Sequence, residues 1–164
     1  MQIEDEQSGD APLISALTTA AFRDAPHSDQ RESAIIIGLR DAGALTLSLV
    51  VRKGAELIGH IAFSPVRLTG VSGDWYGLGP VSVAPEHQRQ GIAAGLIREG
   101  LRRIQAGGAA GCTVVGDPAY YQRFGFRHFP TLSYAGIPDE YVMGLGFHDT
   151  RPSGQLSYHA AFSA

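Results

Sequence analysis

Residues 78–116 hold a strand, a helix and a second strand in close succession, and this order limits the folds open to the chain. The run VSVAP from residue 81 is β-rich, and CTVV, residues 112–115, is a short apolar strand after a glycine-rich helix end. The helix between them has one apolar face, made of Ile92, Ala93, Leu96, Ile97, Leu101 and Ile104. The spacing predicts a βαβ unit, whose two strands are parallel.

Helices and antiparallel strands are expected before this unit. Asp10 is expected to cap a helix that ends before Pro26 and buries Leu13, Ile14, Leu17 and Ala21. A second helix is expected after HSDQ, burying Ile35, Ile36 and Leu39. The runs within residues 45–68 form a hairpin that turns at KGAE, and a strand over residues 76–83 completes an antiparallel meander.

The remaining segments are short. A strand near residues 1–4 is expected, and a short helix begins at the start of DPAYYQRFGF, with strands near residues 141–147 and 155–162. The sequence therefore predicts an α/β (α+β mixed sheet) fold in one domain that spans residues 1–164.

The charge and the cysteine count restrict the classes of function. The net charge of −3, with little Lys, gives no basic stripe for nucleic acid. The acidic N-terminus does not have the pattern expected of a signal peptide, and no run of about 18 apolar residues is present that we would expect to span a membrane. Cys112, the single cysteine, fits a buried strand better than a nucleophile. We therefore expect a cytoplasmic protein that binds neither nucleic acid nor a membrane.

The corner between the strand and the helix at residues 88–93 favours an anion. A helix N-terminus offers free amides and a partial positive charge, and this one has no Ser, Thr, Asp or Asn as a cap. Gly91 removes a Cβ beside the backbone, while Gln88 and Arg89 add donors. The chain lacks the Gly-Lys-Ser/Thr ending of a P-loop and the G-x-G-x-x-G of a dinucleotide site. The pattern indicates a diphosphate cradle without lysine or metal.

The motif QRQGIA, residues 88–93, resembles the Arg/Gln-x-x-Gly-x-Gly/Ala signature of the GNAT superfamily of acetyl-CoA-dependent N-acetyltransferases. Downstream, AYYQRFGF at residues 119–126 is similar to the Tyr-x-x-x-Gly-Phe of the same superfamily, and the resemblance covers about residues 10 to 130. It implies the GNAT-like acyl-CoA N-acyltransferase fold, in which a meander precedes a βαβ unit with splayed central strands. It also implies an acyltransferase that uses acetyl-CoA as cosubstrate and an amine acceptor, without a metal.

The resemblance implies roles for residues at two places. The loop amides would hold the coenzyme A diphosphate, and the strand before the loop would hold the pantetheine arm; these positions are Val81, Ser82, Val83, Gln88, Arg89, Gln90, Gly91, Ile92, Ala93 and Ala94. Tyr121 would be the catalytic acid that protonates the departing thiolate, with the adjacent Tyr120 as the alternative. Many members place an Asn well ahead of this tyrosine, whereas the segment here reads VVGDPAYY. Asp117 would either cap the short helix or contact the cofactor arm, and a helix cap is its expected role.

Other parts of the function stay open at this point. The general base is one of Glu32, His60, Glu86, Asp117 and His128. Neither the amine acceptor nor a role for the C-terminal third follows from any motif, and a homodimer is left open. The alternative to an enzyme with a direct, ternary-complex transfer is a non-catalytic acyl-CoA-binding regulatory module.

Overall fold

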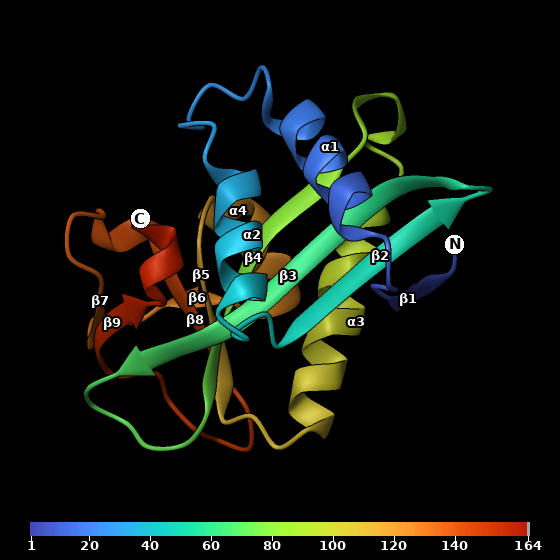
Figure 1. Cartoon of the computed structure of the whole chain (residues 1–164). Coiled ribbons are helices and arrows are strands. Elements are labelled where there is room, and N and C mark those ends of the chain that lie inside the picture. The colour runs from blue at the N-terminus through green and yellow to red at the C-terminus, as the bar shows by residue number, and fades with distance from the viewer. Residues whose placement is uncertain (164) are drawn as a thin grey trace.

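The computed structural model describes residues 1–163, in which strands and helices alternate along the chain (Figure 1). Its helices are α1 (Ala11–Phe22), α2 (Glu32–Asp41), α3 (Ile92–Ala106) and α4 (Pro118–Tyr121). Its strands are β1 (Ile3–Asp5), β2 (Leu47–Lys53), β3 (Glu56–Leu68), β4 (Trp75–Val83), β5 (Gly111–Val115), β6 (Arg127–His128), β7 (Leu132–Ser133), β8 (Val142–Gly146) and β9 (Gly154–Tyr158). Short 3₁₀ turns lie at Pro85–His87, Gln122–Phe124, Asp139–Tyr141 and Ala160–Phe162.

The sheet is mixed, as predicted. Its main path runs β1-β2-β3-β4-β5-β8-β6, while β9 pairs with the end of β3 and with β7. The pairs β2–β3 and β3–β4 are antiparallel, and β4 and β5 are parallel. The predicted hairpin, meander and βαβ unit are therefore confirmed.

Helices cover both faces of this sheet. On one face, α3 lies so close to β3 that a Cβ at Gly100 would stand 2.2 Å from Cε1 of Phe63. On the other face, Thr18 of α1 accepts a hydrogen bond from Ser82 of β4, with 3.4 Å between the two hydroxyl oxygens. Since neighbouring side chains on a strand point to opposite faces, β4 contributes to both layers of the core.

Strand β4 is irregular in the middle and leaves β5 there. Ile61 of β3 pairs with Val81 and Phe63 pairs with Leu78, so two residues of β4, Gly79 and Pro80, face a single residue of β3. Such an arrangement is a β-bulge, which bends the strand that carries it. The parallel pairing with β5 ends at Gly77, before the bulge. Residues 78–83 are thus paired on one side only, and the central strands are splayed.

Three local predictions need correction. Asp10 stands at the N-terminus of α1 but does not cap it, because its carboxylate forms an ion pair with Arg52. Leu13 is 45% exposed, because the buried face of α1 consists of Ile14, Leu17 and Thr18. The last predicted strand ends at Tyr158, and a 3₁₀ turn follows.

Candidate functional site

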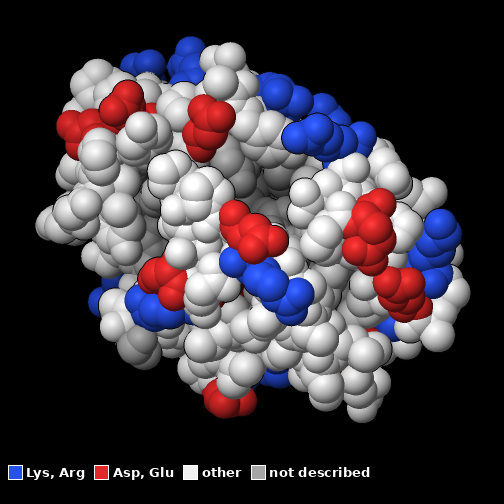
Figure 2. Space-filling model, turned by 90° about the horizontal axis from the view of Figure 1, so that it is seen from above, with Lys and Arg blue, Asp and Glu red and all other residues white. Residues whose placement is uncertain are grey.

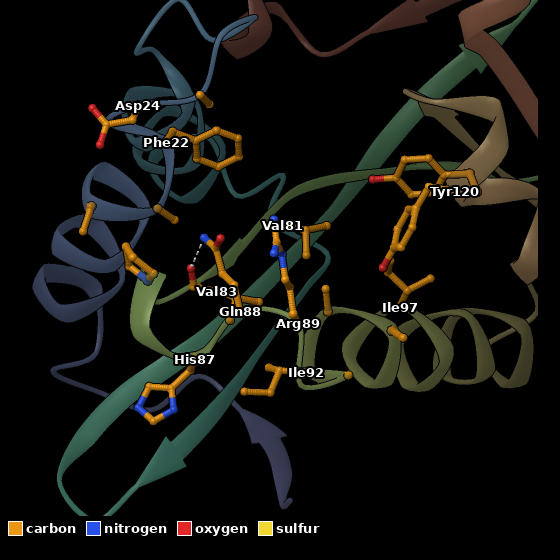
Figure 3. A pocket seen from close by; sticks show the side chains of 18 of the residues that line it. Phe22, Asp24, Val81, Val83, His87, Gln88, Arg89, Ile92, Ile97 and Tyr120 are labelled. Atoms are coloured by element: carbon orange, nitrogen blue, oxygen red, sulfur yellow. Dashed lines mark hydrogen bonds between the residues drawn. The ribbon is translucent and has the colours of Figure 1, made fainter.

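A cavity of about 860 Å³ lies where the end of α1, the end of β4, the start of α3 and α4 meet. In Figure 3, Phe22 and Asp24 lie on one side and Tyr120 lies opposite them, with Val81, Val83, Gln88 and Arg89 between. Seen from above, the molecule is hollowed near the middle of this face, and Lys and Arg side chains stand along part of the rim (Figure 2). The cavity opens beside the part of β4 that is not paired with β5.

The loop before α3 has a backbone that favours anion binding. Arg89 and Gly91 both have left-handed backbone angles, with φ of 64° and 85°. The first amide of the helical ladder is that of Gly95, which donates to the carbonyl of Gly91 at 3.0 Å. The amides before it have no intrahelical acceptor, and no side chain of residues 1–163 caps the helix. A Cβ added at Gly91 would contact nothing within 4 Å.

The charges around this loop are mostly positive. Arg89 and Arg123 line the cavity, and Asp24 is the carboxylate on the opposite wall. The carboxylate of α3, Glu99, accepts hydrogen bonds from Arg102 and Arg103 farther along the helix, and these hold its pKa at about 2. The cavity therefore offers an anion two guanidinium groups as well as the helix N-terminus.

Most of the predicted cofactor-binding residues line the cavity, namely Val81, Val83, Gln88, Arg89, Gly91, Ile92, Ala93 and Ala94. Ser82 and Gln90 are not among the lining residues, and the Ser82 side chain is buried toward α1. The Gln88 side-chain amide donates to the carbonyl of Val83 at 3.2 Å (Figure 3). That carbonyl lies on the part of β4 beyond its pairing with β5.

Sequence reasoning missed the opposite wall of this cavity. It consists of the end of α1 and the residues after it, with Ala20, Ala21, Phe22, Asp24 and Ala25. The available signal was the run of small residues TTAA before Phe22, because small side chains leave room beside a helix. Ile97 of α3 also lines the cavity, although its apolar character indicated only a core position.

A second cavity of about 410 Å³ lies beside the first, where β4 and β5 are splayed. The two cavities share three of their lining residues, which are Phe22, Val81 and Tyr121. The second cavity also reaches Glu32 of α2 and three aromatic residues from the C-terminal third, Tyr134, Tyr158 and Phe162. The site therefore has two compartments that meet at Tyr121.

Tyr121 is held firmly at this junction. Its ring packs edge-on against Phe126, with 6.0 Å between the ring centres, and a Cβ at Gly116 would stand 2.5 Å from its Cε2. Burial raises the pKa of Tyr121 to about 12, so its hydroxyl keeps its proton at neutral pH. Tyr120 lines only the first cavity and stacks with the guanidinium of Arg123.

Among the five candidates for the general base, Glu32 is the one that lines a cavity next to Tyr121. The hydroxyl of Ser28 donates to both of its carboxylate oxygens at 2.8 Å. Glu86 is exposed in the 3₁₀ turn after β4, and His128 is exposed on β6. Asp117 caps α4, as predicted, by accepting from the amide of Ala119 at 3.0 Å.

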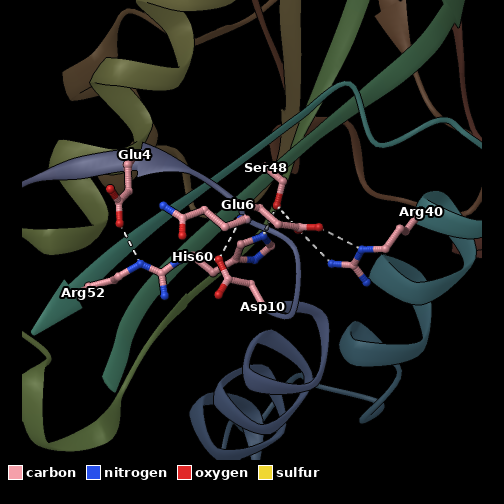
Figure 4. A network of polar contacts seen from close by, with 8 residues as sticks. Glu4, Glu6, Asp10, Arg40, Ser48, Arg52 and His60 are labelled. Atoms are coloured by element: carbon pink, nitrogen blue, oxygen red, sulfur yellow. Dashed lines mark hydrogen bonds and ion pairs between the residues drawn. The ribbon is translucent and has the colours of Figure 1, made fainter. Parts of the chain in front are cut away.

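His60 lies elsewhere, in a buried polar network between the sheet and the N-terminal helices (Figure 4). Its Nε2 is 2.8 Å from the hydroxyl of Ser48, which donates to Glu6, and Glu6 pairs with Arg40. Burial lowers the pKa of His60 to about 4. It lines neither of the two cavities, so the structure gives it a place in a buried polar network and not beside Tyr121.

Three further observations concern chemistry outside the two cavities. Cys112 is fully buried on β5, as predicted, and burial raises the pKa of its thiol. Within residues 1–163, no cluster of three His, Cys, Asp or Glu side chains has the arrangement to hold a metal ion. In the same residues, no helix has the length and apolar character needed to cross a membrane.

Comparison with known proteins gives consistent matches over most of the chain. The acetyltransferase (GNAT) domain family matches residues 3–129. The uncharacterized N-acetyltransferase YhbS of Escherichia coli strain K12 is 39% identical over 128 residues, which are 77% of this chain and 74% of that protein.

Two solved structures are similar over nearly the whole chain. A GNAT family acetyltransferase from Brucella melitensis, in complex with acetyl-CoA, has 46% identity and a TM-score of 0.87, covering 98% of this chain and 97% of that one. The structure of YhbS from Escherichia coli in complex with CoA has 33% identity and a TM-score of 0.87, covering 99% and 92% of the two chains.

Proposed function

The chain belongs to the GNAT family of acetyltransferases, and from this premise we propose that it moves an acetyl group from acetyl-CoA directly to a primary amine. The observation that carries the proposal is that two cavities meet at Tyr121, a tyrosine whose hydroxyl stays protonated. One cavity has the donors that a diphosphate needs, and the other has a carboxylate suited to an amine. Both substrates would therefore be bound together, in a ternary complex.

The residues of the first cavity fit coenzyme A. The amides around Gly91 and the guanidinium groups of Arg89 and Arg123 would bind its phosphates. The unpaired edge of β4 at Val81–Val83 would bind the pantetheine arm by backbone hydrogen bonds, as an added strand does. The side chain of Gln88, which now donates to the carbonyl of Val83, would give up that acceptor to the arm.

In the proposed reaction, each proton has a place to go. Glu32 accepts a proton from the ammonium group and releases it to solvent, and the neutral nitrogen then forms a bond to the carbonyl carbon of the acetyl group. The nitrogen is positively charged after this attack and loses its second proton to Glu32 as the tetrahedral intermediate collapses. As the carbon–sulfur bond breaks, Tyr121 donates its proton to the sulfur and regains one from solvent. The products are the N-acetylated amine and the free thiol of coenzyme A. A backbone amide of β4, at Val83 or beside it, would polarise the carbonyl oxygen.

The substitution Tyr121→Phe tests this proposal directly. It keeps the ring contacts, so the melting temperature and the Kd for acetyl-CoA should stay near the wild-type values. Loss of a general acid lowers the turnover number by roughly 10² to 10⁴. The assay measures release of the CoA thiol with a panel of amines, and Tyr120→Phe is the matched control. Wild-type turnover in Tyr121→Phe would overturn the role of this hydroxyl.

The assignment of Glu32 as the base has its own test. In Glu32→Gln, kcat should fall by roughly 10² or more at neutral pH and recover in part as the pH rises and the free amine becomes more abundant. Glu86→Gln, which changes an exposed carboxylate outside both cavities, is the control. Equal pH profiles for Glu32→Gln and the wild type would exclude Glu32.

Three coarser features complete the proposal. Residues 1–164 would form a single N-acetyltransferase domain. The protein would act in the cytoplasm, in keeping with its one buried, free cysteine. A homodimer is retained as a hypothesis, and the mass of the protein in solution would decide it.

A further inference from the structure

The wall of the second cavity is mostly hydrocarbon and aromatic surface. Its apolar side comes from α1, α2 and the splayed strands, with Phe22, Ile35, Leu78, Pro80, Val81, Val114 and Val115. Its other side is formed by Tyr121, Tyr134, Tyr158 and Phe162. Glu32 is the one Asp, Glu, Lys, Arg or His residue that lines it within residues 1–163. A ligand of this cavity therefore meets one carboxylate and otherwise mainly aliphatic and aromatic side chains.

The aromatic side of this wall is held in place by contacts far apart in the sequence. The rings of Tyr134 and Tyr158 are 5.2 Å apart between centres, and those of Tyr158 and Phe162 are 4.9 Å apart. The hydroxyl of Tyr158 is 3.2 Å from that of Thr113 on β5. Strand β9 pairs with the end of β3, which anchors this segment to the sheet. The wall is thus built before any ligand arrives.

These three aromatic residues also lie after residue 129, beyond the part of the chain that matches the GNAT domain family. The first cavity, in contrast, is lined only by residues within that part. Three of the residues that would contact an acceptor therefore lie outside the part of the chain that matches the family, whereas the residues that would bind coenzyme A all lie within it.

We propose that the acceptor is a small primary amine with an aromatic or bulky hydrocarbon body, bound with its ammonium group against Glu32 and its body against Tyr134, Tyr158 and Phe162. This inference rests on the proposed function. A volume of about 410 Å³ suits a small molecule with one ring. A single carboxylate pairs with one ammonium group, so polyamines and aminoglycosides, which carry several, fit poorly. Aromatic rings also attract the cation of the amine.

The test compares amines in the full-length protein with saturating acetyl-CoA. Phenethylamine is the probe, while ethanolamine, spermidine and a lysine-containing peptide are the comparisons. We expect kcat/KM for phenethylamine to exceed that for ethanolamine by tenfold or more, because burial of the ring strengthens binding. Calorimetric titration of the CoA-saturated protein with phenethylamine measures the same preference as a binding affinity, without the transfer reaction.

The variant Phe162→Ala separates a specificity role from a purely structural one. It should raise KM for phenethylamine on the order of tenfold, while KM for acetyl-CoA and for ethanolamine stays within twofold. Phe129→Ala, which removes a half-buried ring outside both cavities, is the matched control. Equal effects of Phe162→Ala on phenethylamine and ethanolamine would overturn the assignment.

The outcomes distinguish this inference from the proposed function. CoA release that is as fast with ethanolamine, spermidine or the peptide as with phenethylamine would overturn the inference and keep the acetyltransferase. Binding of phenethylamine that depends on Phe162, without CoA release from any amine, would keep the inference about the cavity and overturn the transfer reaction. Neither binding nor release would overturn both.

Discussion

The substitution Gly91→Glu should separate ligand binding from folding. Gly91 has a φ of 85°, where a residue with a Cβ is strained by roughly 1–2 kcal/mol. A Cβ there would touch nothing within 4 Å, so no steric clash adds to this strain. A chain of this length loses about 2–4 °C of melting temperature for each kcal/mol. The protein should therefore fold, with a melting temperature only a few degrees lower.

Binding of acetyl-CoA should suffer much more. The new carboxylate would enter the cavity in which the phosphates are expected. Two like charges about 4 Å apart repel by about 1 kcal/mol in water and about 4 kcal/mol near a protein surface. The Kd for acetyl-CoA should therefore rise by roughly fivefold to a thousandfold, and the effect should shrink as salt is added. Calorimetric titration with acetyl-CoA measures the Kd.

Two control variants isolate the causes. Gly91→Gln has nearly the same size without the charge, so the salt-dependent part of the loss should be absent. Gly108→Ala introduces the same kind of strain, at a φ of 95° and with no atom within 4 Å, at the other end of α3. Its Kd should equal that of the wild type. A wild-type Kd in Gly91→Glu would refute the placement of the phosphates at this loop.

Three further predictions concern stability and reactivity. Burial lowers the pKa of His60 from 6.5 in the unfolded chain to about 4 in the folded protein, so the unfolded chain takes up a proton first as the pH falls. The free energy of unfolding should therefore be highest above pH 6.5 and drop by roughly 3 kcal/mol between pH 6.5 and 4. In His60→Gln, urea unfolding should show a shallower pH dependence. Gly100→Ala should destabilise the protein by about 1–3 kcal/mol, because the added methyl group clashes with the buried ring of Phe63. Gly95→Ala is the control and should not destabilise it, because its methyl group meets the exposed side chain of Met1. Thermal melts of the two variants measure the difference. Cys112 should resist a thiol-alkylating reagent until the protein is unfolded, and rapid labelling of the native protein would contradict its burial.

The elements and the loop before α3 could be predicted because their causes are local. The apolar positions of α3 repeat with the helical period, and residues 45–68 hold two β-rich runs on either side of the turn KGAE. The left-handed backbone at Gly91 also depends on its own sequence neighbourhood, since glycine adopts it without strain. The GNAT resemblance rested on two such local motifs.

Side-chain partners across the sheet were less predictable. Asp10 has the sequence position of a helix cap, yet its carboxylate forms an ion pair with Arg52, which lies on the distant strand β2. His60 had the strand position of a side chain that faces a cleft, yet it lies under the N-terminal helices against Ser48. In each case the residue type limited the chemistry, but only the packing of distant segments chose between the partners.

The sequence by itself therefore determined the order of elements, the parallel unit and the left-handed glycine in the loop before α3. The tertiary structure alone decided which residues share the second cavity, because Phe22, Glu32, Tyr121 and Phe162 are brought together by the splay of β4 from β5 and by the pairing of β9 with β3. Local periodicity records which face of an element is buried, but not which distant element covers it. The cavity proposed for the amine lies between such elements, and no single stretch of the chain contains it.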